Sequence, residues 1–285
     1  MVAQTLTPPS SRAVQAGLKA HPRIANVIAV GSGKGGVGKS TTTVNLALAL
    51  HRLGLRVGVL DADVYGPSVP LMLGLSGRPE STEDKKIIPM RALGVDTMSI
   101  GYLIEEDSPM IWRGPMATQA LTQFFNDTLW DDLDVLLIDL PPGTGDIQLT
   151  LAQKIPVAGA VVVTTPQEVA TLDARKALAM FEKVNIPVLG LVENMAVHVC
   201  SACGHAEHIF GQGGGQAMAA RYNVPLLGSL PLDAAIREQA DAGTPIVSAQ
   251  PDGVISQAYV ALARALVERL ATRPRAQIAL NTLGS

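Results

Sequence analysis

The chain has 285 residues and a net charge of −3, which gives no support to a broad nucleic-acid-binding surface. Hydrophobic residues make up 47% of it and aromatic residues only 4%, so its core must be aliphatic, as in parallel strands covered by helices. No apolar run reaches the ~18 residues that a membrane span requires. Two cysteines are too few for a disulfide framework. These features predict a cytoplasmic protein with neither a membrane nor a nucleic acid as partner.

In chain order, residues 1–25 are expected to form a flexible leader and residues 272–285 a tail. Between them the sequence predicts apolar strands at 26–30, 56–60, 95–100, 134–140, 159–165, 188–193 and 226–230. Helices are predicted at 39–53, 169–183 and 254–270. This alternation predicts one α/β domain over residues 26–271, with a mostly parallel twisted sheet and helices on both faces. Binding loops should lie beyond the carboxyl ends of the strands.

The residues after the first strand match a phosphate-binding loop. Gly33 to Ser40 fit G-x-x-x-x-G-K-[ST] between a strand and a helix, which is the context that this motif requires. Lys39 would reach the β- and γ-phosphates of a nucleotide, and the Ser40 hydroxyl would bind Mg²⁺. The predicted nucleotide-binding residues of the loop are Gly33, Lys34, Gly35, Gly36, Val37, Gly38, Lys39, Ser40 and Thr41.

The same stretch also matches a dinucleotide-binding pattern. Gly31 to Gly36 fit G-x-G-x-x-G, and Asp61 lies near the position of a ribose-binding acid. A dinucleotide site, however, has no use for a Lys-Ser pair at the loop end and does not predict a second aspartate at a later strand end. The sequence therefore favours a P-loop ATPase that uses ATP and Mg²⁺.

Lys34 departs from a generic P-loop. A second lysine in G-K-G-G-x-G-K-S marks the deviant Walker A subclass, in which two subunits face each other and this lysine reaches the partner's nucleotide. Such a cation would offset charge on the transferred phosphoryl group, as an arginine finger does. Lys34 is therefore expected to be catalytic in a homodimer; the alternative is that it binds only the phosphates of its own subunit.

Carboxylates follow two of the predicted strands. Asp139 ends an aliphatic strand as a Walker B aspartate does and would hold Mg²⁺ through water, before a Pro-Pro-Gly switch loop. Asp63 is expected to orient the attacking water and Asp61 to support the magnesium site, although a strand-terminal Asp also serves as a helix cap or turn former. Asn194 follows another strand and is expected to bind the adenine base; the alternative is a tight turn.

Cys200 and Cys203 are the two cysteines of the chain. A zinc site or a four-iron cluster needs four ligands. His205 and His208 could complete a local zinc site, but their spacing is too tight for the usual zinc ribbon. A two-fold dimer would instead supply four thiolates. The open alternatives are a bridging iron–sulfur cluster, a bridging zinc, a thiol redox pair and a loop without chemistry.

With these motifs in place, the chain resembles the Mrp/ApbC family of iron–sulfur cluster carrier ATPases, relatives of MinD and the nitrogenase iron protein. The resemblance extends over about residues 20–270. Its motifs are 33–41, 61–68, 112–115, 139–146, 193–195, the cysteine pair and 210–215. It implies a homodimer that holds a labile 4Fe-4S cluster between subunits and transfers it to apo-proteins. A slow ATPase would gate the transfer, with the 139–143 switch relaying nucleotide state to the cysteines.

The main rival is a positioning ATPase of the MinD or ParA kind with a structural zinc at the cysteine pair. A membrane-binding version would need a detachable basic amphipathic helix, and a DNA-binding version a basic surface. Neither explains the cysteines. A nucleotide-gated electron donor like the nitrogenase iron protein fits poorly, because the cluster cysteines of that protein lie far apart in sequence.

Overall fold

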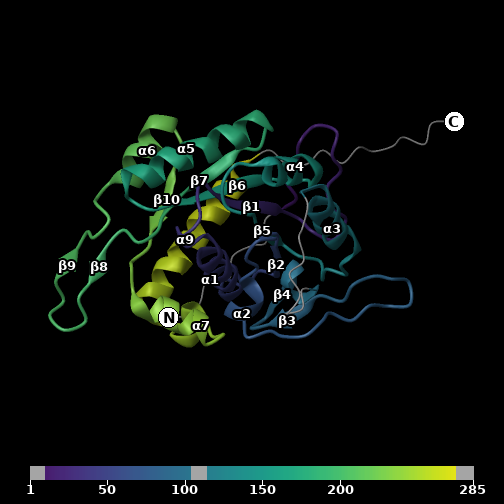
Figure 1. Cartoon of the computed structure of the whole chain (residues 1–285), viewed down its shortest axis with the longest axis horizontal. Helices are drawn as coiled ribbons and strands as arrows, with labels where there is room; N and C mark the ends of the chain where they lie inside the picture. The colour runs from purple at the N-terminus through teal and green to yellow at the C-terminus, as the bar shows by residue number, and fades with distance from the viewer. Residues whose placement is uncertain (1–9, 104–113, 274–285) are drawn as a thin grey trace.

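The computed structural model describes residues 10–103 and 114–273. Its centre is an eight-stranded sheet in the order β10-β7-β6-β1-β5-β2-β4-β3 (Figure 1). Every pairing is parallel except that of β3 with β4. The strands are β1 (Val27–Ser32), β2 (Val57–Asp61), β3 (Met90–Ala92), β4 (Val95–Ser99), β5 (Val135–Asp139), β6 (Gly159–Thr164), β7 (Val188–Glu193) and β10 (Leu226–Ser229).

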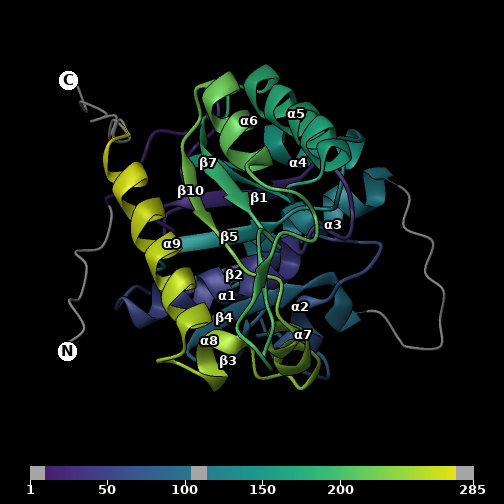
Figure 2. The same ribbon diagram turned by 90° about the vertical axis from the view of Figure 1, so that its left-hand side faces the viewer.

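Helices cover both faces of the sheet (Figures 1 and 2). On one face lie α1 (Lys39–Arg52), α2 (Val69–Met72), α7 (Ala234–Asp241), α8 (Ile246–Ala249) and α9 (Val254–Ala271). On the other lie α3 (Gly114–Asp127), α4 (Asp146–Lys154), α5 (Glu168–Lys183) and α6 (Gly214–Tyr222). A short 3₁₀ helix, Ile100–Leu103, follows β4. The predicted α/β fold with one mostly parallel sheet is confirmed.

The two cores arise from the two-residue period of the strands. In β1, Ile28 and Val30 belong to the core under α1 and α9, whereas Val27 and Ala29 belong to the core under α4 and α5. All six residues of this strand are buried, because both faces are covered. This explains why the central strands read as continuous aliphatic runs rather than as an alternating pattern.

Several short elements were not predicted from the sequence. They include the antiparallel edge strand β3 and a separate hairpin of β8 (His198–Val199) and β9 (Ala206–Glu207). The hairpin projects beyond the main sheet (Figure 1). Within the two described ranges, no helix combines the length and apolar character needed to cross a membrane.

Parallel pairing brings the carboxyl ends of the central strands to one edge. Asp139 of β5 is in register with Val30 of β1 on one side and with Asp61 of β2 on the other. The loops that follow these strands, and the loop after β7, therefore open at the same edge of the sheet. This edge holds the candidate site.

Candidate functional site

The loop between β1 and α1 borders a cavity of about 490 Å³. Gly36 and Gly38 have φ angles of 78° and 79°, in the left-handed region that favours glycine. A Cβ on Gly38 would lie 2.2 Å from Nδ2 of Asn194, so a larger residue would displace this amide. Since the loop carries no side chains at these points, an anion can approach its backbone N–H groups and the amino terminus of α1.

The phosphate-loop lysine lies in a buried network of polar groups. Nζ of Lys39 is 2.7 Å from Oδ2 of Asp139 and 3.9 Å from Oδ2 of Asp63. Ser40 Oγ donates to the same Asp139 oxygen at 2.5 Å, and Thr43 Oγ1 donates to the other at 2.8 Å. Asp139 is fully buried, so these partners offset the cost of its desolvation. Lysine, hydroxyl and carboxylate together provide the cation and the oxygen ligands that a magnesium–phosphate group needs.

The other two predicted carboxylates differ in environment. Asp61 is fully buried and accepts hydrogen bonds from Asp63 N, Val69 N and Ser99 Oγ at 3.1, 3.2 and 2.9 Å. Burial, with a smaller contribution from the charge of Asp139, raises the pKa of Asp61 to about 7. The Asp61 carboxylate thus anchors the loop between β2 and α2 in this structure.

Asp63 lies at the cavity itself. It is 9% exposed and lines the cavity beside Lys39. Burial raises the pKa of Asp63, although the nearby ammonium opposes this shift. A carboxylate in this position can accept a hydrogen bond from a water in the cavity.

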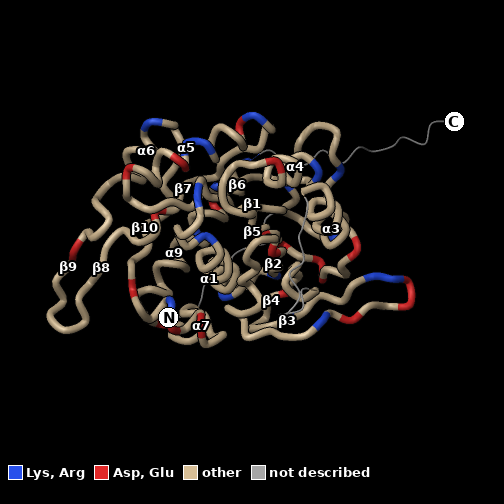
Figure 3. Tube along the Cα trace, in the orientation of Figure 1, with Lys and Arg blue, Asp and Glu red and all other residues tan. Residues whose placement is uncertain are grey.

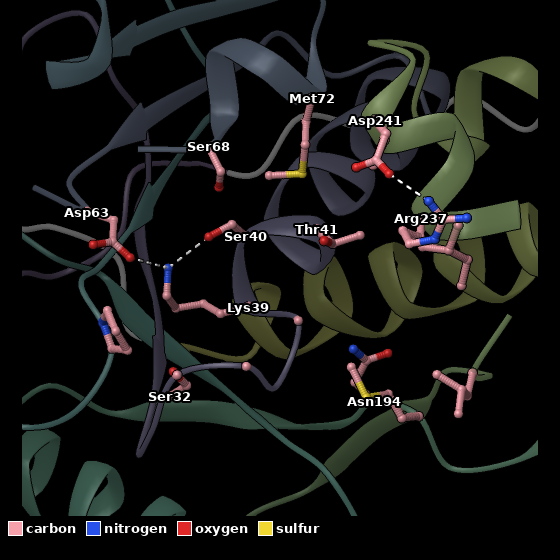
Figure 4. Close-up of a pocket in the computed structure, with 18 of the residues that line it drawn as sticks. Ser32, Lys39, Ser40, Thr41, Asp63, Ser68, Met72, Asn194, Arg237 and Asp241 are labelled. Atoms are coloured by element: carbon pink, nitrogen blue, oxygen red, sulfur yellow. Dashed lines mark hydrogen bonds and ion pairs between the residues drawn. The ribbon is translucent and has the colours of Figure 1, made fainter. Parts of the chain in front are cut away.

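The opposite end of the cavity lies between α2 and α7. Asn194 donates from Nδ2 to the Val37 carbonyl at 2.9 Å, while Arg237 pairs with Asp241 at 2.8 Å on the far side (Figure 4). Apolar side chains line the space between them: Leu71, Met72, Met195, Leu232 and Ile236. Lys39, Ser40 and Asp63 lie at the other end of the same view. One end of the cavity therefore carries the Lys39 ammonium and buried carboxylates, and the other combines apolar side chains with an ion pair at its edge, an arrangement that suits a nucleoside phosphate.

The remaining loop residues take different positions. Lys34, Gly35 and Thr41 line the cavity, but Gly33 and Val37 do not. Instead, Gly33 packs against α5, and Val37 is buried and supplies the carbonyl that holds Asn194. Lys34 is half-buried, and its ammonium makes no hydrogen bond or ion pair with any residue that the structure describes.

The cysteines lie at the turn of the β8–β9 hairpin and do not line the cavity. Cys200 is partly exposed and Cys203 exposed. The backbone N–H groups of Ala202 and Cys203 point at the Cys200 sulfur and lower the pKa of this thiol. Across residues 10–103 and 114–273, no group of three or more His, Cys, Asp or Glu side chains could hold a metal. His205 and His208 therefore do not complete a zinc site with the pair in one chain.

The hairpin is nearly free of charge. Between Asn194 and Gly213 the chain carries one charged residue, Glu207 (Figure 3). Two apolar side chains of this segment are exposed, Val199 by 47% and Ile209 by 50%. A surface of this kind can approach a second apolar surface without repulsion between like charges.

Sequence reasoning missed several site residues. Thr43 lies one helical turn after Lys39 and therefore faces the same way, so its spacing could have revealed it. Ser99, Leu232 and Arg237 come from elements far along the chain, and no local motif marks them. Their place in the site depends on tertiary packing.

Comparisons with known proteins agree with this geometry. The sequence profile described as "ParA: NUBPL iron-transfer P-loop NTPase" matches residues 23–267. An "Iron-sulfur cluster carrier protein" of Pseudomonas fragi is 59% identical over 251 residues, covering 87% of this chain and 88% of that protein. A protein of the same name from Haemophilus influenzae is 61% identical over 84% of this chain, which spans 65% of that longer relative.

A solved structure has a similar fold. It is the nucleotide-binding protein of Archaeoglobus fulgidus in complex with ADP, with a TM-score of 0.69 and 39% sequence identity. The match covers 78% of this chain and 87% of the other.

Proposed function

The chain belongs to the NUBPL iron-transfer P-loop NTPase family, and on this basis we propose that it is an ATP-dependent carrier of a 4Fe-4S cluster. Two copies of the chain would hold the cluster between them and release it to apo-proteins that need it. The observation that carries the proposal is the solvent-accessible pair Cys200 and Cys203 on a hairpin that begins a few residues after the cavity-lining Asn194 and Met195. The relatives from Pseudomonas fragi and Haemophilus influenzae, both called cluster carriers, support it.

The proposed cargo site is shared by two subunits. One chain offers two thiols, and a four-iron cluster takes four. A two-fold axis beside the hairpin turns would bring two pairs together. The hairpin surface, with its single charged residue, supports this arrangement. The lowered pKa of Cys200 supports it too, because a thiolate is the form that binds iron.

The proposed nucleotide site uses the cavity from end to end. Ser40 and Asp139 would hold Mg²⁺, with Asp61 behind them, and the ion supplies neutralising charge on the phosphates when bound. Lys39 would exchange its ion pair with Asp139 for the phosphate oxygens. Asp63 would orient the attacking water and accept its hydrogen bond.

Asn194 is proposed to select adenine. One N–H of its Nδ2 donates to the Val37 carbonyl, which leaves the second N–H as a donor and Oδ1 as an acceptor. Adenine presents an exocyclic amino donor beside a ring-nitrogen acceptor, so it can pair with both groups. Guanine has a carbonyl in place of that amino group, so Oδ1 would lose its donor there and ATP would be favoured over GTP.

Anaerobic reconstitution with iron and sulfide tests the cargo. We expect about four irons per dimer and a visible iron–sulfur chromophore, both lost in Cys200→Ser/Cys203→Ser. Ser201→Ala, a change between the two cysteines, is the matched control and should keep both signals. Tight zinc binding without a chromophore in the unmodified protein would contradict the carrier proposal and favour a structural clamp.

A further inference from the structure

The pairing of β7 with β10 continues beyond the ends of both strands. Leu230 N donates to the Glu193 carbonyl, and Ala196 N donates to the Leu230 carbonyl, at 2.8 and 2.9 Å. Leu232 N then donates to the Val197 carbonyl at 2.8 Å. The segment 194–197 is thus held along its length by the segment 230–232. We call these two segments together the hairpin root, because β8 begins directly after the first.

Two histidines fasten the hairpin to this root. His198, the first residue of β8, donates from Nδ1 to the Leu232 carbonyl at 3.0 Å. His208, which follows β9, donates from Nδ1 to the Ala196 carbonyl at 2.7 Å. Each arm of the hairpin is therefore tied to the root by one imidazole.

The hairpin root is also a wall of the nucleotide cavity. Asn194 and Met195 from its first segment line the apolar end of the cavity, as does Leu232 from its second. Asp233, also at the cavity, caps α7 by accepting from Ala235 N at 2.8 Å. A base that enters this end would contact residues of the two segments to which the imidazoles are hydrogen-bonded.

The loop after β5 has no comparable link. Its Gly143 N donates to the Ser32 carbonyl, and Gln148 Nε2 donates to the Pro142 carbonyl, at 3.0 and 2.6 Å. In the part of the chain that the structure describes, no hydrogen bond joins residues 139–148 to residues 193–212. In the sheet, β1 and β6 separate β5 from β7.

We propose that His198 and His208 are positioning residues that transmit nucleotide occupancy from the hairpin root to Cys200 and Cys203. A base seated against Asn194 and Leu232 shifts the root, and the two imidazoles move the arms of the hairpin with it. The inference rests on the proposed function in treating the hairpin as the cargo site. In this proposal, nucleotide occupancy affects the cysteines of the same subunit through the base end of the cavity, and not through the switch loop after β5.

Thiol reactivity tests this route without any cluster. Because the chain has two cysteines, the total alkylation rate of the apo-protein reports the hairpin alone. We expect Mg²⁺ with a non-hydrolysable ATP analogue to change this rate about fivefold or more, the size of a typical coupling between sites. In His198→Ala/His208→Ala the ratio of alkylation rates with and without nucleotide should fall to about one. The nucleotide affinity of this variant should be retained, because neither histidine lines the cavity.

Three further variants separate the explanations. His198→Asn/His208→Asn places an amide N–H near the position of each Nδ1 and should restore the ratio. His205→Ala changes an exposed hairpin histidine that has no bond to the root and should keep it. Gln148→Ala frees the switch loop and should also keep it.

The inference is overturned if the unmodified protein shows no nucleotide-dependent rate, or if the ratio survives in the double alanine variant. It is also overturned if the asparagine variant behaves like the alanine variant, or if Gln148→Ala alone abolishes the ratio. Reconstitution with iron and sulfide is measured separately. A nucleotide-dependent thiol rate in a protein that forms no cluster would refute the cargo and leave the coupling intact.

Discussion

At the scale of single residues, the site concentrates buried charge. Asp139 pairs with the Lys39 ammonium and accepts from two hydroxyl groups, so its negative charge is well compensated. Asp61, in register with it on the next strand, has hydrogen bonds but no cation within ion-pair distance among the described residues. Burial and the charge of Asp139 therefore both favour the protonated form of Asp61.

This difference predicts how stability depends on pH. The pKa of Asp61 is about 7 in the folded chain against 3.8 for the ordinary group, so between these values the folded state holds a proton that the unfolded state releases. The contribution of this proton to the free energy of unfolding is complete below about pH 4 and is lost as the pH rises through about 7. Asp61→Asn should reduce this decline in the free energy of unfolding, measured by urea titration at pH values between about 4 and about 7. Asp146→Asn, at an exposed carboxylate, should keep the original slope; an unchanged slope in Asp61→Asn would contradict the assignment.

At the scale of elements, one glycine fixes the distance between the phosphate loop and α5. A Cβ on Gly33 would lie 2.0 Å from the backbone carbon of Asp173, and helix backbone cannot yield as the end of a side chain can. Gly33→Ala should lower the free energy of unfolding by about 1–3 kcal/mol, as overpacking does. Gly66→Ala, where nothing lies within 4 Å, is the matched control in the same urea titration. Equal stability of the two variants would show that α5 can move away.

The sequence predicts the central strands and the helices α1, α5 and α9, but it missed α3, which has 14 residues. The strand that ends at Asp139 and the helix that begins at Lys39 follow from an aliphatic run and a motif with a known context. The strand β3 was missed because it is a short edge strand with the unremarkable sequence Met-Arg-Ala. The hairpin was missed because its strands have two residues each, too few to show a period.

The same contrast holds for the site. That Lys39 and Asp139 approach each other could be predicted, since both follow central strands whose carboxyl ends share one edge. The bond between Asn194 and the Val37 carbonyl could not, because it joins residues 157 positions apart through the packing of β7. The part of the cavity wall formed by α7 likewise could not be predicted from the sequence, because it depends on tertiary packing.

At the scale of the whole molecule, Lys34 predicts a dimer that depends on ATP. Lys34 lines the cavity, and its ammonium has no hydrogen-bond or ion-pair partner within the described chain. Lys34→Ala should bind ATP but hydrolyse it about 100-fold more slowly or worse, because it lacks a cation at the transferred phosphoryl group. Sedimentation with Mg-ATP should also show fewer dimers.

Lys183→Ala, at the far end of α5, is the control and should match the unmodified protein in both assays. If Lys34→Ala lost ATP affinity while its dimer persisted, the lysine would serve the phosphates of its own subunit instead.

The hairpin turn has a cost that follows from its exposure. In a single chain, thiols at the turn of a projecting hairpin are open to dissolved oxygen as well as to a recipient protein until a second copy covers them. A cluster seated there would be easy to hand over and equally easy to destroy. A carrier of this kind would work best if it held each cluster only briefly. Rapid transfer would then matter more than storage.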